Sequence, residues 1–164
     1  MIIRNWIILL FFISLISISS ALIAEYFFNL QPCELCLKQR HPYYLILICL
    51  ILIFLLKNFN KIRLYLVIQF ASVYGLFYSI WHVGVENKIF KGPTGCSAML
   101  TNSENTTDLK AQILSKQVIS CDEVIWSFFG ISAASINTVV LLVIFILNAI
   151  YLFRYYGIKK EKSV

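Results

Sequence analysis

The chain has 164 residues, of which 60% are hydrophobic and only 13% are charged, and its mean hydropathy is +0.81. A soluble domain carries about a quarter charged residues, so roughly half of the usual charge is missing. Disorder, collagen and low-complexity linkers are excluded, because aromatic residues make up 15% and there are only 6 Gly and 3 Pro. These values predict a small integral membrane protein.

Four apolar segments predict helices that cross about 30 Å of hydrocarbon. A cleavable signal peptide competes with the first of them, but the apolar run there outlasts the usual length of about 7–15 residues. The apolar core of the second segment is too short to span, so its helix is expected to start earlier and to contain Pro42. Within one membrane domain over residues 1–164, we predict spans over 6–28, 33–56, 64–83 and 131–153.

The fourth predicted span carries several polar side chains. Such groups in a membrane helix either pack against neighbouring helices through hydrogen bonds or line a transport path, and we expect the former. They are Ser132, Ser135, Asn137 and Asn148.

Lys and Arg gather on one side of the predicted membrane. The ends of the chain and the link between the second and third spans hold eight Lys/Arg and one acidic residue, whereas the other side holds six of each. Glu25, near the end of the first span, completes the net charge of +6. The positive-inside rule therefore predicts cytoplasmic termini and outer loops at about 29–32 and 84–127. In a bacterial inner membrane, these outer loops would face the periplasm. Topology explains the basic balance, so no nucleic-acid partner is expected.

Four of the five cysteines fall on the predicted outer side. Cys33 and Cys36 lie at the outer start of the second predicted span, and Cys96 and Cys121 lie in the second loop. Cys49 is expected to be a packing residue inside the membrane. An oxidising periplasm favours disulfides among the outer four, and three pairings are open. A bridge between Cys96 and Cys121 would stabilise the loop by about 3–4 kcal/mol, whether it is inert or active.

The Cys33-x-x-Cys36 spacing is typical of a reversible dithiol, because the start of a helix favours the thiolate. Pro32 suits the first position of that helix. Arg40 follows on the same helical face, where its charge would lower a thiol pKa and bind a ligand oxygen; reaching to lipid headgroups is the alternative. His82 ends the third span, either as an interfacial residue or as a donor to a ligand near Arg40. No metal is expected at these residues.

These segments resemble the disulfide bond formation protein B (DsbB) family of bacterial inner-membrane thiol oxidases. The resemblance is carried by PCELCLKQRHPY at 32–43, WHVGVE at 81–86, and the positions Cys96, Cys121, Trp126, Phe128, Gly130 and Ser132. It implies an all-α integral membrane protein, a four-helix transmembrane bundle with two outer loops carrying cysteine pairs. Residues 109–118, inside the second loop, are expected to form either a surface helix or a plain loop.

The resemblance also implies a membrane thiol:quinone oxidoreductase that supports disulfide formation in secreted proteins. It would reoxidise a DsbA-like periplasmic thioredoxin-fold dithiol protein and pass the electrons to ubiquinone or menaquinone. The partner would attack Cys96, whose bridge partner would be Cys121, and Cys33 would exchange with Cys121. The thiolate that meets the quinone would be Cys36, with Arg40 and His82 as further quinone-binding residues.

Three other interpretations stay open at this point. A vitamin K epoxide reductase-like relay also couples thiols to quinone, but its Cys-x-x-Cys would fall late in the chain, and here it falls early. A metal-handling membrane protein would use Cys33, Cys36 and a histidine as ligands, without a second close cysteine pair. A structural membrane protein would carry two inert disulfides.

Overall fold

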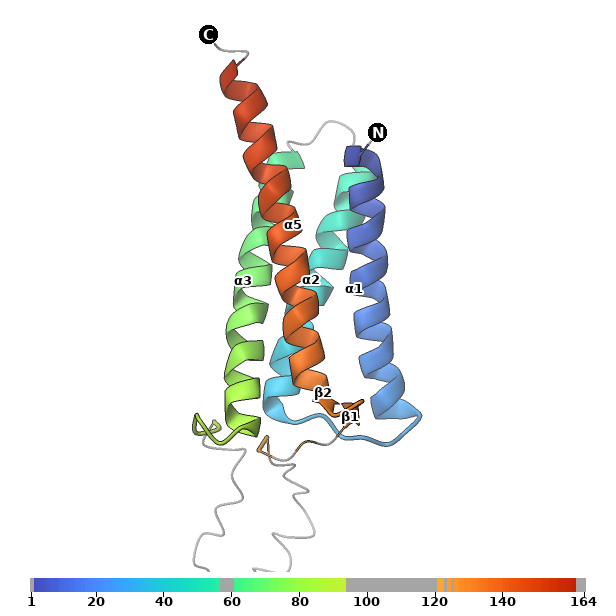
Figure 1. Ribbon diagram of the computed structural model, residues 1–164. Helices are drawn as coiled ribbons and strands as arrows, with labels where there is room; N and C mark the ends of the chain where they lie inside the picture. Colours follow the sequence, from blue (N-terminus) through green and yellow to red (C-terminus); the bar gives the residue numbers. More distant parts are fainter. Residues whose placement is uncertain (1, 57–60, 94–120, 123, 125, 162–164) are drawn as a thin grey trace, which may run out of the picture.

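The computed structural model describes residues 2–56, 61–93, 121–122, 124 and 126–161 (Figure 1). Its described part is dominated by four long helices that stand side by side. The ends of the chain lie at one end of the bundle, and α2 begins at the other, which we call the cysteine end (Figure 1). The helices are α1 (Ile2–Tyr26), α2 (Glu34–Leu55), α3 (Lys61–Glu86) and α5 (Ala133–Glu161).

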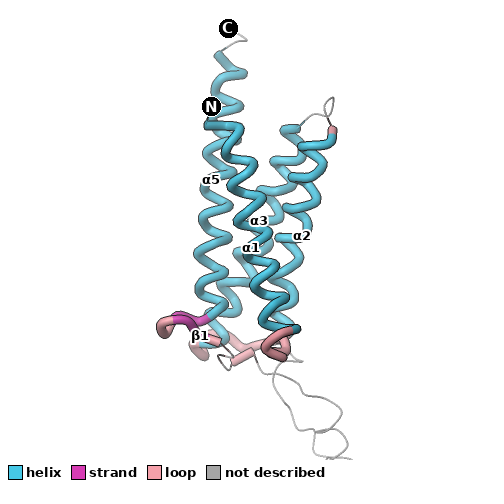
Figure 2. The backbone as a smooth tube through the Cα atoms, turned by 90° about the vertical axis from the view of Figure 1, so that its right-hand side faces the viewer, coloured by secondary structure: helices cyan, strands magenta, loops and turns pink. Residues whose placement is uncertain are grey.

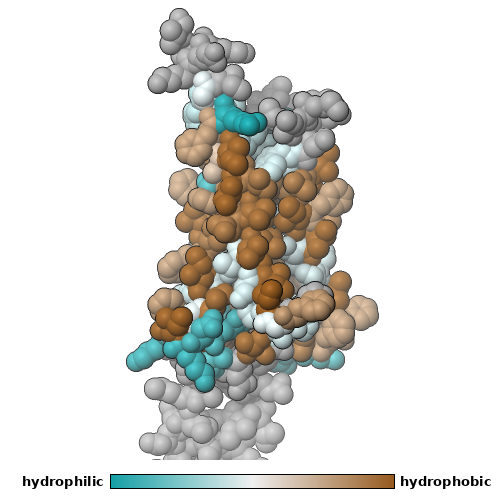
Figure 3. All heavy atoms as spheres, in the orientation of Figure 1, coloured by the Kyte–Doolittle hydropathy of each residue, from teal (hydrophilic) through white to brown (hydrophobic). Residues whose placement is uncertain are grey.

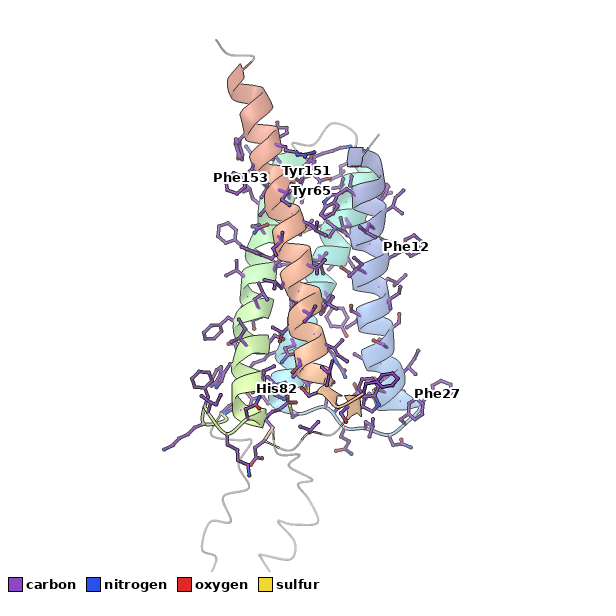
Figure 4. The ribbon with its side chains drawn as sticks, in the orientation of Figure 1. Phe12, Phe27, Tyr65, His82, Tyr151 and Phe153 are labelled. Carbon is purple, nitrogen blue, oxygen red and sulfur yellow. The ribbon has the colours of Figure 1, made fainter. Side chains whose placement is uncertain are left out.

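Each of these helices is long and apolar enough to cross a membrane, so the expected four-helix transmembrane bundle is confirmed. Apolar side chains cover the middle of the face shown in Figure 3, and hydrophilic residues gather toward its lower end. Phe12 and Phe153 project away from the bundle in Figure 4 and are mostly exposed. An exposed apolar belt of this kind fits contact with lipid.

Helix α3 is the central element, because it packs along both α2 and α5, whereas α1 packs mainly against α2. The helices run nearly parallel to one axis in both views (Figure 2). Small residues let α3 approach its neighbours closely, as in other membrane bundles. A Cβ added at Gly75 would lie 2.9 Å from Cγ of Pro42 on α2 and 3.0 Å from Cδ1 of Leu141 on α5.

Polar groups of α5 bond to neighbouring helices, as expected for packing groups. Asn148 is fully buried and donates both to the Tyr65 carbonyl at 3.0 Å and to Gln69 Oε1 at 2.7 Å. Beside them the rings of Tyr65 and Tyr151 pack at a tilt of 39°, with centroids 4.3 Å apart (Figure 4). This polar cluster therefore joins α3 to α5 at the end of the bundle opposite the cysteines.

The predicted spans are right in number and order but differ at their ends. The first helix ends at Tyr26, and α3 extends three residues beyond each predicted end, so the predicted loop over 84–127 starts too early. The fourth span was predicted to begin at residue 131, but Ile131–Ser132 forms strand β2, paired antiparallel with β1 (Ser127–Phe128). Positive φ at Phe129 and Gly130 closes this hairpin, as two-residue type I′ turns require. The predicted segment 109–118 lies outside the described residues.

Candidate functional site

Cys33 and Cys36 form the start of α2, at the cysteine end. Cys33 is the N-cap residue, with φ −71° and ψ 169°, and its sulfur accepts a hydrogen bond from the Cys36 backbone N–H at 3.4 Å. The two sulfurs lie 3.2 Å apart, and both thiols are free. The expectation that Pro32 is the first helical residue is wrong, because the Cys33 sulfur caps the helix and Pro32 therefore lies before the cap.

The surroundings of Cys33 favour its thiolate. Its side chain is buried, which opposes ionisation, but the hydrogen bond from Cys36 outweighs burial, and His82 and the Cys36 backbone N–H also stabilise the charge. Together they lower the pKa of Cys33 from 9.0 to about 4. The negative charge of a reduced pair is therefore held at Cys33, where the helix N-terminus also favours it.

His82 lies near the end of α3 (Figure 4), and its two ring nitrogens approach the two sulfurs. Its Nε2 is 3.6 Å from Cys33 Sγ, and its Nδ1 is 4.0 Å from Cys36 Sγ. Nε2 is also 3.9 Å from Oε1 of Glu86, one turn further along α3. Of the two interpretations of His82 from the sequence, the interfacial one does not fit, since the ring is buried against the cysteines.

Two amide side chains complete the surroundings of His82, and sequence reasoning assigned neither to the site. Gln39 on α2 donates through Nε2 to His82 Nδ1 at 2.8 Å. Asn137 on α5 donates to Gln39 Oε1 at 2.7 Å and accepts from the Tyr43 hydroxyl at 2.6 Å. The one signal in the sequence was the place of Gln39, one helical turn after Cys36 on the face that carries Cys36.

Arg40 is held by α1, which the sequence did not indicate. It forms an ion pair with Glu25 and donates to the carbonyl of Ala21 at 3.3 Å. The Arg40 side chain is only 13% exposed and that of Glu25 27%, so the pair lies in the bundle rather than among lipid headgroups. Both groups belong to the cysteine end, since Glu25 lies next to the end of α1.

Cys121 lies in the apolar cluster at the start of α2. It is disulfide-bonded and 1% exposed, and the same cluster contains Cys33, Leu35 and Val85. The described part of the chain therefore brings Cys121 to the pair Cys33 and Cys36, while Cys96 lies outside the described residues. Cys49 is free and packs in the core between the helices, as the sequence predicted.

The ligand atoms of Cys33, Cys36 and His82 lie within 4.8 Å of one another. Two thiolates and one imidazole are a ligand set that zinc accepts. The same three residues are also what a dithiol redox site with an adjacent base requires. Geometry alone therefore allows either a metal site or a redox pair.

Comparison with known proteins separates these options at the level of the family. The family model described as "Disulfide bond formation protein DsbB" matches residues 3–151. An "Uncharacterized protein RP370" from Rickettsia prowazekii (strain Madrid E) is 28% identical over 143 residues, which cover 86% of this chain and 83% of that protein. No solved structure matches the chain significantly. The chain is a multi-pass membrane protein and belongs to the DsbB family of disulfide-forming oxidoreductases.

Proposed function

We propose that this chain is a membrane thiol:quinone oxidoreductase that reoxidises a DsbA-like dithiol protein and so supports disulfide formation in secreted proteins. One observation carries the proposal. The disulfide-bonded Cys121 shares an apolar cluster with Cys33, whose thiolate is favoured, so two cysteine systems meet at one end of the bundle. Membership of the DsbB family supports the same reaction class.

In the proposed reaction, a thiolate of the partner attacks Cys96 and Cys121 leaves as a thiolate. Cys121 then attacks Cys33, the bond between Cys33 and Cys36 breaks, and Cys36 leaves. The partner's second thiolate releases Cys96 as the partner's disulfide forms, and Cys96 in turn releases Cys33 by re-forming its bond to Cys121. The net result moves two electrons and two protons from the partner to the pair Cys33 and Cys36.

The residues at this end fit a quinone. A quinone carbonyl oxygen needs N–H donors, and a guanidinium has five, of which the two described contacts of Arg40 use one on each terminal nitrogen. Arg40, His82 and the sulfur of Cys36 would hold the ring. Bound quinone would supply the two-electron acceptor, and either ubiquinone or menaquinone suits this chemistry. Arg40→His is expected to weaken quinone reduction while the protein still inserts, and unchanged turnover would contradict this role.

The proposed location is the bacterial inner membrane, with both termini in the cytoplasm and the cysteine end in the periplasm. Two observations support it: the shared end of the termini and the excess of Lys and Arg at that end (Figure 1). Labelling of single introduced cysteines with a membrane-impermeant maleimide in intact cells tests the orientation. Modification at the C-terminus without lysis would contradict it.

The experiment that tests the reaction mixes the purified protein, without oxygen, with a reduced DsbA-like protein and a soluble quinone. Quinone absorbance is expected to fall as partner disulfide appears in equal amount. Cys33→Ala should abolish this turnover, and Cys49→Ala is the matched control, since Cys49 is also buried but lies in the helix core. Turnover that survives Cys33→Ala would overturn the proposal.

The group formed by Cys33, Cys36 and His82 favours a second candidate, a metal-handling protein. Its measurement is the metal content of protein purified from membranes without chelator. One zinc per chain, lost in Cys36→Ala, would support this candidate and contradict the thiol relay.

A further inference from the structure

A chain of hydrogen bonds crosses the bundle beside the cysteine pair. It runs from the Tyr43 hydroxyl to Asn137, from Asn137 to Gln39, and from Gln39 to Nδ1 of His82, with distances of 2.6, 2.7 and 2.8 Å. The residues come from α2, α5 and α3, and Tyr43, Gln39 and His82 are buried. Buried polar groups in a membrane must find partners, and these find one another.

The donor-to-acceptor direction of these hydrogen bonds is set by the backbone of α3. Gln39 Nε2 lies 3.5 Å from the carbonyl oxygen of Tyr78, which can only accept, so the amide nitrogen of Gln39 must face α3. Its oxygen then faces Asn137, which must present its own nitrogen. The oxygen of Asn137 is left to accept from Tyr43, and each amide has one orientation that satisfies all of its neighbours.

This direction decides which nitrogen of His82 carries the proton. Nδ1 accepts from Gln39, so the neutral imidazole bears its hydrogen on Nε2. That nitrogen is the one 3.6 Å from Cys33 Sγ and 3.9 Å from Glu86 Oε1. Glu86 is itself held, because its other oxygen accepts from the Ser132 hydroxyl at 2.5 Å.

We propose that Gln39 is a positioning residue of the redox site, which holds His82 in the Nε2–H tautomer so that the imidazole donates toward the Cys33 sulfur. The tautomer matters because the other form would present a lone pair to the sulfur, and a lone pair repels a thiolate. The assignment rests on the proposed function only in so far as the Cys33 thiolate takes part in exchange. Gln39 acts through His82 and touches no reacting atom.

The groups that set the charge near His82 come from several elements. Among the described residues, its titratable contacts are Cys33 and Cys36 at the start of α2 and Glu86 on α3. From α5 come the neutral side chains of Asn137, through Gln39, and of Ser132, through Glu86. The ion pair of Arg40 with Glu25 joins α2 to α1 one turn beyond Cys36.

The same tautomer bears on the metal candidate. In it the Nδ1 lone pair accepts from Gln39 and Nε2 carries a proton, so neither nitrogen is ready to ligate a cation. A metal would require the Gln39 amide to turn over, and the contacts to Tyr78 and Asn137 oppose that turn.

The first test is ¹⁵N NMR of the full chain labelled at histidine and reduced. The chain has two histidines, so the His41→Asn variant assigns the His82 signals. We expect wild-type His82 to show a protonated Nε2 and an unprotonated Nδ1, and Gln39→Leu to show a mixture of tautomers. A protonated Nδ1 in the neutral wild-type ring would overturn the proposal without any variant.

The second test is the pH profile of iodoacetamide alkylation at Cys33, read by mass spectrometry of its peptide in fully reduced protein. On the acid side of the profile, we expect Gln39→Leu to be alkylated about tenfold more slowly, which is the effect of one pKa unit. Gln69→Leu is the matched control, because Gln69 bonds Asn148 on α5 in the same way but lies 13 positions, about 20 Å, along α3 from His82. Identical profiles for Gln39→Leu and wild type would overturn the proposal.

The outcomes separate this inference from the proposed function. If the tautomer and the alkylation profile are as expected but quinone is not reduced, the positioning role stands and the oxidoreductase proposal fails. If quinone is reduced and Gln39→Leu has the wild-type profile, the reaction stands and the positioning role fails.

Discussion

Arg40 on α2 forms an ion pair with Glu25, which lies at the end of α1 and 15 residues earlier in the chain. The guanidinium also bonds the carbonyl of Ala21, so two groups of α1 hold it in the bundle. Arg40 lies one helical turn after Cys36, on the same face of α2. Helix α1, which packs mainly against α2, therefore contributes to the candidate site by holding Arg40.

Replacing Glu25 with Ala is expected to raise the quinone KM, because Arg40 loses the carboxylate that orients it. A hydrogen bond to a charged group contributes about 1.5–3 kcal/mol, so the expected rise is roughly tenfold or more. Glu25→Gln keeps an acceptor oxygen and should change KM less. The measurement is initial rates of quinone reduction at saturating reduced partner.

The control for this prediction is Glu34→Ala. Glu34 also pairs with a basic residue, Lys38, at 2.7 Å. Both of these side chains are more exposed, Glu34 at 46% and Lys38 at 32%. Surface pairs contribute little, so KM should stay at the wild-type value. A lower KM in Glu25→Ala would contradict the prediction and indicate that Glu25 competes with quinone for Arg40.

The reactivity of Cys33 is expected to persist at acid pH. With a pKa of about 4, the thiolate of the reduced protein should be alkylated at a constant rate down to about pH 5, and more slowly below. Since this pKa lies below the 9.0 of an ordinary thiol, ionisation stabilises the folded reduced protein fully above pH 9. That stabilisation is lost as the pH falls toward 4.

Two substitutions check the cause of this low pKa. Cys36→Ala removes the largest contribution and should move the alkylation midpoint toward 9, and His82→Ala should move it less in the same direction. Alkylation of Cys33 in fully reduced protein, followed over pH 3–10, measures both midpoints. A midpoint that stays in place in both variants would contradict this cause and would leave the helix N-terminus as the group that lowers the pKa.

The helices were predictable from the sequence because a membrane span is encoded locally, in a run of apolar residues that any 20-residue window reveals. The residues at which the helices begin and end were harder to predict. Cys33 takes the N-cap position through its own sulfur, which displaces Pro32 from the helix, and cysteine is not among the residues usually expected to cap. The hairpin at Phe129 depends on a positive φ at a non-glycine residue, which no local pattern predicts.

The site was predictable only where its members are close in sequence. Cys33, Cys36 and Arg40 share one helical face, so their spacing alone relates them. The contact of Gln39 with His82 spans 43 residues and that with Asn137 spans 98. Such contacts depend on which helices pack together and at what rotation, and hydrophobic periodicity carries no such information in a helix that is apolar on all sides.

Gly75→Ala is expected to destabilise the bundle. The added Cβ would lie 2.9 Å from Pro42 and 3.0 Å from Leu141, so α3 would have to move away from a neighbour. Overpacking of this kind costs about 1–3 kcal/mol, which should appear as a lower Tm in detergent. Gly157→Ala in α5 is the control, because in the part of the chain that the structure describes no neighbouring atom lies within 4 Å of its added Cβ. Equal Tm values for the two variants would contradict the close packing of α3.

Cys36→Ala is expected to trap a bridge between Cys33 and Cys121. Both sulfurs belong to one buried cluster, and without Cys36 the Cys33 thiolate has no partner at the start of α2. Its attack on the disulfide of Cys121 would form the new bond and release the former partner of Cys121 as a free thiol. Peptide mapping under non-reducing conditions identifies the new bridge, and a maleimide of defined mass counts the released thiol.

The matched variant for this trap is Cys49→Ala, which removes a buried thiol that lies in the helix core and should leave the disulfide of Cys121 unchanged. Cys36→Ala protein that retains the original disulfide, with Cys33 still free to alkylation, would contradict exchange between the two cysteine systems. Since the proposed relay requires that exchange for every pair of electrons, this result would count against the relay itself and not only against one step. A bridge that forms only after denaturation would count the same way, because the cluster would then not bring the two sulfurs within reach in the folded protein.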